Sequence, residues 1–380
     1  MLPKRRFFKH APEAPVLYNS VHMLSDIVRV LVPAAASFLI GMATTPILTH
    51  YLYKHRAWKK KAGKTALDGS AASEFNRLHE EHEVRAPRMG GIVIWGSVLI
   101  TIVGIAVLAR LIPGPAFENL DFLSRSETWI PLAMLLVGAF AGFIDDLLVI
   151  RPGGSGLPLS FRLLIVLVLS SFIGWWFWAK LAVTAVDIPF ASPLEIGWLI
   201  IPLFVLISLA LYASGVIDGI DGLSGGVFGS IFGSYAVIAF AQNQIDLAAF
   251  CAAVGGGILA FLWFNIPPAR FYMTDTGTMA LTLTIAVIAF MTDNLGGGVG
   301  ISVLPVIGVL LVATVASDIA QVVSKKFFGK KLLRIAPLHH HFEALGWPGY
   351  KVVMRYWVLS VLFAVVGVIL ALAAIQNVPL

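Results

Sequence analysis

Apolar residues run in long, nearly uninterrupted stretches along the whole chain, and short polar segments separate them. A helix needs about 20 residues to cross a bilayer, so these stretches predict membrane-spanning helices. We expect an all-α polytopic membrane protein in which residues 1–23 form an N-terminal tail and residues 24–380 form a single integral membrane domain. The ten predicted spans lie at about 24–53, 89–112, 129–150, 161–179, 196–216, 222–241, 247–264, 278–292, 300–325 and 352–375.

The composition agrees with this pattern. Of the 380 residues, 58% are hydrophobic and only 13% are charged, whereas about 25% charged residues are usual in soluble proteins. The balance excludes a soluble protein, and we expect no nucleic acid among the partners. The single cysteine, Cys251, lies inside an apolar stretch, which excludes an intrachain disulfide.

The loops between the spans differ in charge. Ten spans place alternate loops on opposite sides of the membrane, and the loops near 54–88 and 326–351 fall on the same side as those near 145–160, 217–221 and 265–277. By the positive-inside rule this lysine-rich and arginine-rich set is cytoplasmic. The basic residues of the N-terminal tail do not follow this rule, because the alternation of the spans places the tail on the outer side. The two clusters that decide the orientation are Lys54, Arg56, Lys59, Lys60, Lys61 and Lys64, and Lys325, Lys326, Lys330, Lys331 and Arg334.

Five aspartates interrupt the apolar pattern on the predicted cytoplasmic side. Asp145 and Asp146 end the third span, Asp218 and Asp221 follow the fifth, and Asp275 directly precedes the eighth. A single aspartate at such a place is commonly a helix cap or a turn residue. Five of them at one end of an apolar bundle indicate a functional site.

Clustered carboxylates repel one another unless a cation lies between them. Oxygen ligands without cysteine suit Mg²⁺, which binds through one or two carboxylates and the phosphates of a substrate. The pattern therefore predicts a Mg²⁺-dependent site for a phosphorylated substrate at the cytoplasmic face. A transporter or channel is the alternative from another class, but its ion sites would lie near the bilayer midplane.

Three consecutive histidines, His339, His340 and His341, stand in APLHHHFEALGW, residues 336–347. Neighbours in sequence rarely ligate one metal ion together, and the chain has no HExxH motif with which to build a zinc site. Beside a metal–phosphate site, we expect the histidines to supply hydrogen bonds and positive charge to an anion.

Four segments carry a resemblance to a known family: GFIDD, DGIDGL, FLWFNIPPARFYMTDTGTMAL and APLHHHFEALGWP. They resemble the phospho-N-acetylmuramoyl-pentapeptide transferases, a branch of the polyprenyl-phosphate N-acetylhexosamine-1-phosphate transferase superfamily. The acidic motifs are shared by the superfamily, whereas NIPPA and the histidine box are specific to this branch. The similarity runs from about residue 35 to 375, with the motifs in the family's order.

The resemblance implies an activity. Such an enzyme transfers phospho-MurNAc-pentapeptide from UDP-MurNAc-pentapeptide to undecaprenyl phosphate, which gives lipid I and UMP in the first membrane step of peptidoglycan synthesis. It uses Mg²⁺, forms homodimers, and lies in the bacterial inner membrane with a cytoplasmic active site. A one-step and a covalent route both remain open on the residues alone.

The resemblance also implies residue roles. Asp275, with Asp146, would hold Mg²⁺, and Asp145 would orient or deprotonate the polyprenyl phosphate. His340 completes the expected catalytic set. The expected substrate-binding residues are Asp218, Gly219, Ile220, Asp221, Asn265, Tyr272, Gln321, His339, His341 and Arg162.

Four places depart from the family's pattern. An asparagine expected three residues before Asp218 is Gly215; MGDxGS reads MTDTGT, with Thr274 and Thr278; TPTMGG reads APRMGG, with Arg88; and a lysine expected in a cytoplasmic loop corresponds to Arg162. In addition, Glu83 stands where the family has a lysine just upstream of the APRMGG motif. PRMGG is closer to the PRLGG of the GlcNAc-phosphate branch, so a UDP-GlcNAc:polyprenyl-phosphate GlcNAc-1-phosphate transferase is the alternative function.

Overall fold

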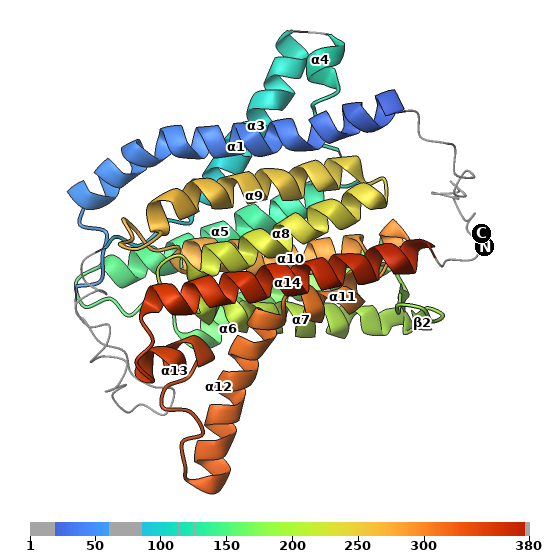
Figure 1. Ribbon diagram of the computed structural model, residues 1–380. Helices are drawn as coiled ribbons and strands as arrows, with labels where there is room; N and C mark the ends of the chain where they lie inside the picture. The colour runs from blue at the N-terminus through green and yellow to red at the C-terminus, as the bar shows by residue number, and fades with distance from the viewer. Residues whose placement is uncertain (1–19, 61–85, 113, 125, 377–380) are drawn as a thin grey trace.

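The computed structural model describes residues 20–60, 86–112, 114–124 and 126–376 (Figure 1). Residues 1–19 of the predicted tail, Lys61, Lys64 and Glu83 lie outside this part of the chain. Nine described helices are long and apolar enough to span a membrane, or ten if one bent pair counts as a single span. The expectation of an all-α polytopic membrane protein with about ten spans is therefore confirmed.

The spans follow the order of the apolar stretches along the chain. Between them lie a four-residue helix, three 3₁₀ turns, one short helix near the C-terminal end and a two-stranded antiparallel hairpin of β1 (Ala185–Val186) and β2 (Leu194–Glu195). The spanning helices are α1 (Ser20–Lys54), α3 (Ile92–Leu111), α5 (Trp129–Ile150), α6 (Leu159–Ala179), α7 (Ile200–Ser214), α8 (Leu223–Ala241), α9 (Ile245–Asn265), α10 (Thr274–Met291), the pair α11 (Gly300–Ile307) and α12 (Val309–Phe328), and α14 (Gly349–Gln376).

Helix α10 is the centre of the bundle. Every residue from 276 to 291 is buried, and α3, α5, α7 and α11 pack around it. Its threonines fit this apolar setting because their hydroxyls donate to carbonyls one turn back: Thr282 to Thr278 and Thr284 to Ala280, both at 2.6 Å. The outer helices instead carry exposed apolar side chains such as Leu31, Leu206 and Ile369, as a lipid-facing surface requires.

Glycines allow α5 to approach α10 closely. A Cβ added at Gly142 would lie 2.0 Å from the carbonyl oxygen of Asp275, and one added at Gly138 would lie 2.8 Å from that of Met279. Only glycine leaves room for backbone at these distances. The approach places the end of α5, with its two aspartates, against the first turn of α10.

Two sequence predictions about α10 and its neighbour were wrong in detail. The eighth span begins at Thr274 instead of 278, so Asp275 lies in its first turn. The amide of Thr276, in the first turn of α10, donates to the Asp146 carboxylate of α5 at 3.0 Å, and no side chain next to the helix start caps it. The local sequence therefore carries no capping signal from which the start of α10 could be predicted. The predicted span 300–325 is bent by 70° at Gly308, shortly after Pro305, into α11 and α12.

Described parts of the loops that the sequence assigns to one side of the membrane lie at one end of the bundle: α1, α5 and α9 end, and α14 begins, at the left of Figure 1, where α13 (Leu338–Ala344) is also found. Contacts join them: Arg88 bonds Asp146, the Leu157 amide bonds Asp145, and Gly219 lies against the histidines of α13. We call this the site end.

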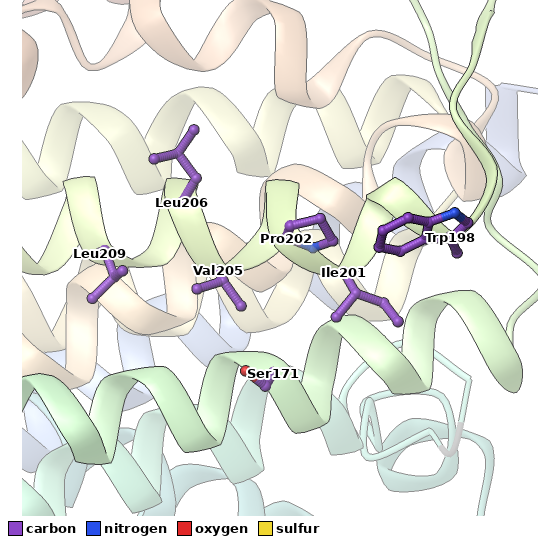
Figure 2. Close-up of a pocket in the computed structure, with 7 residues that line it drawn as sticks. All are labelled: Ser171, Trp198, Ile201, Pro202, Val205, Leu206 and Leu209. Carbon is purple, nitrogen blue, oxygen red and sulfur yellow. The ribbon is translucent and has the colours of Figure 1, made fainter.

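A groove of about 450 Å³ lies between α6 and α7 (Figure 2). Its lining is almost entirely apolar, and Trp198 and Leu206 on its rim are exposed. Such a surface fits hydrocarbon and offers nothing to an anion. The lining residues are Ser171, Trp198, Ile201, Pro202, Val205, Leu206 and Leu209.

Candidate active site

Three carboxylates meet where α5 ends and α10 begins. One oxygen each of Asp145, Asp146 and Asp275 lies within 4.8 Å of the others. Asp145 and Asp146 are 2% and 0% exposed, while Asp275 is half-buried. Three oxygen donors at this spacing, with no sulfur or nitrogen ligand among them, fit a hard divalent cation such as Mg²⁺.

Two of these carboxylates lie beside the same positively charged side chain, that of Arg162. The Nη1 atom of Arg162, from the start of α6, lies 3.2 Å from Oδ2 of Asp275 and 3.9 Å from Oδ2 of Asp145. The other oxygen of Asp145 accepts a hydrogen bond from the Leu157 amide at 2.6 Å, which fixes the loop between α5 and α6. Arg162 therefore belongs to the carboxylate cluster, and its expected contact with the substrate stays a prediction.

Asp146 has a different environment. Both Nε and Nη2 of Arg88 lie 2.8 Å from its Oδ1. Its Oδ2 accepts bonds from the hydroxyls of Thr274 and Thr276, both at 2.5 Å, and from the Thr276 amide. The carboxylate is thus enclosed by donors from two other segments.

The DGIDG turn lies beside this cluster. Asp218 accepts bonds from the Ser224 hydroxyl at 2.7 Å and the Thr274 amide at 2.8 Å, and Asp221 accepts one from the Ala269 amide at 3.0 Å. Burial raises the pKa of the Asp218 carboxyl, and these hydrogen bonds offset the effect only in part. The turn therefore connects α8 to the loop before α10.

The histidine box packs against the same turn. It forms the short helix α13, in which His339 and His340 are buried. A Cβ at Gly219 would lie 2.5 Å from Nε2 of His340 and 2.6 Å from Nε2 of His339, so a larger residue there would require both imidazoles to move. Nδ1 of His340 pairs with Glu343 at 2.8 Å, and His341 instead accepts a bond from the Arg334 amide at 3.1 Å.

Three further predicted site residues are tied to nearby loops. The Asn265 amide bonds Gly222 N and Phe271 O, and the Gln321 amide bonds the backbone of 332–333. The backbone of Tyr272 pairs with Pro87 and Gly90, and its side chain is half-buried, as is Ile220 in the DGIDG turn. Asn265 and Gln321 therefore shape the site end by holding its loops.

Sequence reasoning missed two residues of this region, Glu343 and Ser224. A helix predicted over the histidine box would have placed Glu343 on the same face as His340, three residues earlier, but the box was taken as part of a loop. Ser224 follows Asp218 by six residues, a spacing that carries no signal.

Comparison with known proteins agrees with this geometry. Residues 128–293, from α5 to the end of α10, match the model of glycosyl transferase family 4. A phospho-N-acetylmuramoyl-pentapeptide-transferase of Bacillus mycoides is 34% identical over 346 residues, which cover 89% of this chain and 96% of the relative. Proteins of the same name from Bacillus thuringiensis and Bacillus cereus are 33% identical over the same shares.

The chain belongs to the phospho-N-acetylmuramoyl-pentapeptide transferase family. It is therefore a phosphoglycosyl transferase, and the transporter reading is not needed to explain its buried carboxylates. The match includes both α5 and α10, whose contact assembles the carboxylate cluster. A divalent metal, a nucleotide-sugar donor and a lipid acceptor agree with this membership and with the donor set of the cluster.

Proposed function

We propose that this protein transfers phospho-MurNAc-pentapeptide from UDP-MurNAc-pentapeptide to undecaprenyl phosphate, with lipid I and UMP as products. Similarity over 89% of the chain to proteins named for this transfer carries the proposal. The cluster of Asp145, Asp146 and Asp275, flanked by Arg88 and Arg162, supports it, because phosphoryl transfer between two anions needs both a metal site and fixed positive charge.

Asp275, with a carboxylate of the pair at the end of α5, would hold Mg²⁺, which when bound would neutralise charge on the diphosphate. Arg162 lies close enough to add a guanidinium to the same anion. A phosphate oxygen of the acceptor attacks the sugar-linked phosphorus, and the bond to the phosphate of UMP breaks. Asp145 orients the acceptor or takes its proton, since its Oδ2 is 3.9 Å from the guanidinium and so beyond hydrogen-bond distance.

The donor would lie between the DGIDG turn and the histidine box, which are in contact at Gly219. We assign the nucleoside to Asp218, Gly219, Ile220, Asp221 and the loops held by Asn265, with Tyr272 stacking on uracil. We assign binding of the diphosphate and the sugar to His339, His340, His341 and Arg162, and we place Gln321 at the edge of this pocket. The arrangement faces the cytoplasm of a bacterial inner membrane, and a homodimer is the proposed assembly.

UMP release by the purified protein with undecaprenyl phosphate tests this function. UDP-MurNAc-pentapeptide should support turnover, and chelation of Mg²⁺ should abolish it. The variant Asp275→Asn should lose at least about tenfold in kcat, equivalent to about 1.4 kcal/mol. Full Mg²⁺-dependent turnover by correctly inserted Asp275→Asn would contradict the proposal.

One observation favours UDP-GlcNAc as a second candidate donor. The segment PRMGG resembles the PRLGG of the GlcNAc-phosphate branch, and its arginine, Arg88, bonds a carboxylate of the cluster. The same assay with UDP-GlcNAc separates the two functions. Turnover with UDP-GlcNAc alone would mean that the donor pocket differs from that of the muramoyl-pentapeptide branch. Turnover with UDP-MurNAc-pentapeptide alone would mean that the histidine box indicates the donor better than PRMGG does.

A further inference from the structure

Two of the residues that depart from the family's pattern contact the same carboxylate. Arg88 stands where the family has threonine, and Thr274 stands where it has glycine. In the structure Arg88 binds Oδ1 of Asp146 through two nitrogens at 2.8 Å, and the Thr274 hydroxyl lies 2.5 Å from Oδ2. The two departures therefore form one unit with Asp146 at its centre.

The conformation of Thr274 makes this contact informative. Its φ is +54°, a region that suits glycine and strains a β-branched residue. Such a conformation persists when surrounding groups determine it, and three do so here. The hydroxyl reaches Asp146, the amide of Met89 donates to that hydroxyl at 3.1 Å, and the Thr274 amide donates to Asp218 at 2.8 Å.

The segment around Arg88 is bound to the same loop by its backbone. The amide of Tyr272 donates to Pro87 O at 2.9 Å, and the amides of Gly90 and Gly91 donate to the carbonyls of Tyr272 and Met273 at 2.7 and 3.2 Å. PRMGG and the loop before α10 thus run side by side. A carboxylate bonded to both segments fixes the place where α10 begins, and with it the position of Asp275.

Asp146 has little capacity left for a metal ion. A carboxylate offers about four lone-pair positions, and Asp146 already meets two nitrogens of Arg88, two threonine hydroxyls and the Thr276 amide. It is fully buried, whereas the side chain of Asp275 is 24% exposed. Any ion at this carboxylate would also lie close to the guanidinium of Arg88.

We propose that Arg88 and Thr274 hold both oxygens of Asp146, so that Asp146 positions the turn carrying Asp275 and is not itself a ligand of the divalent cation. Asp145 and Asp275 then hold the ion. This refines the expectation that Asp146 joins Asp275 as a metal ligand, and it rests on the proposed function only for the presence of a divalent cation.

Mn²⁺ binding to the purified full chain without substrates, followed by electron paramagnetic resonance, tests the assignment. The double variant Arg88→Gln/Asp146→Asn removes both members of the ion pair and keeps the net charge. Its Mn²⁺ Kd should stay within about threefold of the wild type, while Asp145→Asn and Asp275→Asn each weaken binding at least about tenfold. Weakening of the double variant to the level of Asp275→Asn would overturn the proposal.

A second variant keeps the test decisive if the neutral pair does not fold. Arg88→Thr/Thr274→Gly restores the family's residues and releases Asp146 from both contacts. It should bind Mn²⁺ at least about threefold more tightly, because a repelling cation is removed and a carboxylate oxygen becomes available. An unchanged Kd would overturn the proposal. Loss of UMP release with this Mn²⁺ pattern intact would refute the proposed function and leave Asp146's role standing.

Discussion

At the scale of single residues, the pair of His340 and Glu343 determines which nitrogen faces the site. The Glu343 carboxylate lies 2.8 Å from Nδ1, which favours a proton on that atom. Nε2 is then directed to Gly219 of the DGIDG turn, where a Cβ would be only 2.5 Å away. With the diphosphate at His340, as proposed, Glu343 would act on the substrate through His340 and is therefore a proposed positioning residue.

The variant Glu343→Gln tests this arrangement. Loss of the negative charge weakens the preference for the proton on Nδ1 and the stabilisation of a cationic His340 beside the diphosphate. We expect kcat/KM for UMP release to fall about tenfold, or about 1.4 kcal/mol, with its pH profile displaced. The control Glu195→Gln, the same change on strand β2 away from the site end, should leave both unchanged. An unaltered pH profile in Glu343→Gln would contradict the positioning role.

At the scale of helices, the contact between α5 and α10 assembles the carboxylate cluster. A methyl group at Gly142 would lie 2.0 Å from the carbonyl oxygen of Asp275 and 2.3 Å from its carbonyl carbon. Both of these atoms are backbone, so a larger residue must push the helices apart instead of rotating a side chain.

We expect Gly142→Ala to lower the free energy of unfolding by about 1–3 kcal/mol, the usual cost of overpacking. It should also weaken Mn²⁺ binding, because Asp275 moves away from Asp145. Gly104→Ala on α3 is the matched control, since a Cβ there meets nothing within 4 Å. The control should be neutral or more stable by up to about 1 kcal/mol. Thermal unfolding in detergent measures the stability of each variant, and Mn²⁺ titration measures its metal affinity. Equal stability and equal Mn²⁺ affinity of Gly142→Ala and Gly104→Ala would refute the packing argument.

The same scale shows what the sequence could and could not predict. The spans and their order followed from hydrophobicity, because lipid contact requires apolar side chains on the outer helices and burial in the bundle requires them on α10. The convergence of Asp145, Asp218 and Asp275 followed from counting spans. The bend at Gly308, the start of α10 at Thr274 and the short helix α13 did not follow. The start of α10 depends on a contact between distant segments, the bond from Thr276 to Asp146.

At the scale of the whole molecule, the charges of the loops predict which side of the membrane the site end faces. The site end carries Lys54, Lys59 and Lys60 at and just after the end of α1, and it also carries every carboxylate of the candidate site. The opposite end carries the β1–β2 hairpin. The positive-inside rule predicts that the site end is cytoplasmic, where a nucleotide-sugar donor would be available.

Cysteine labelling in intact cells tests this orientation, and the chain is well suited to it. Its single cysteine, Cys251, is completely buried and should not react with a membrane-impermeant maleimide. With Cys251→Ala as background, Ser192→Cys in the exposed hairpin should label in intact cells, whereas Lys330→Cys in the loop after α12 should label only after permeabilisation. The reverse pattern would place the carboxylate cluster on the side that lacks nucleotide sugars, and the proposed donor would then be excluded by topology alone.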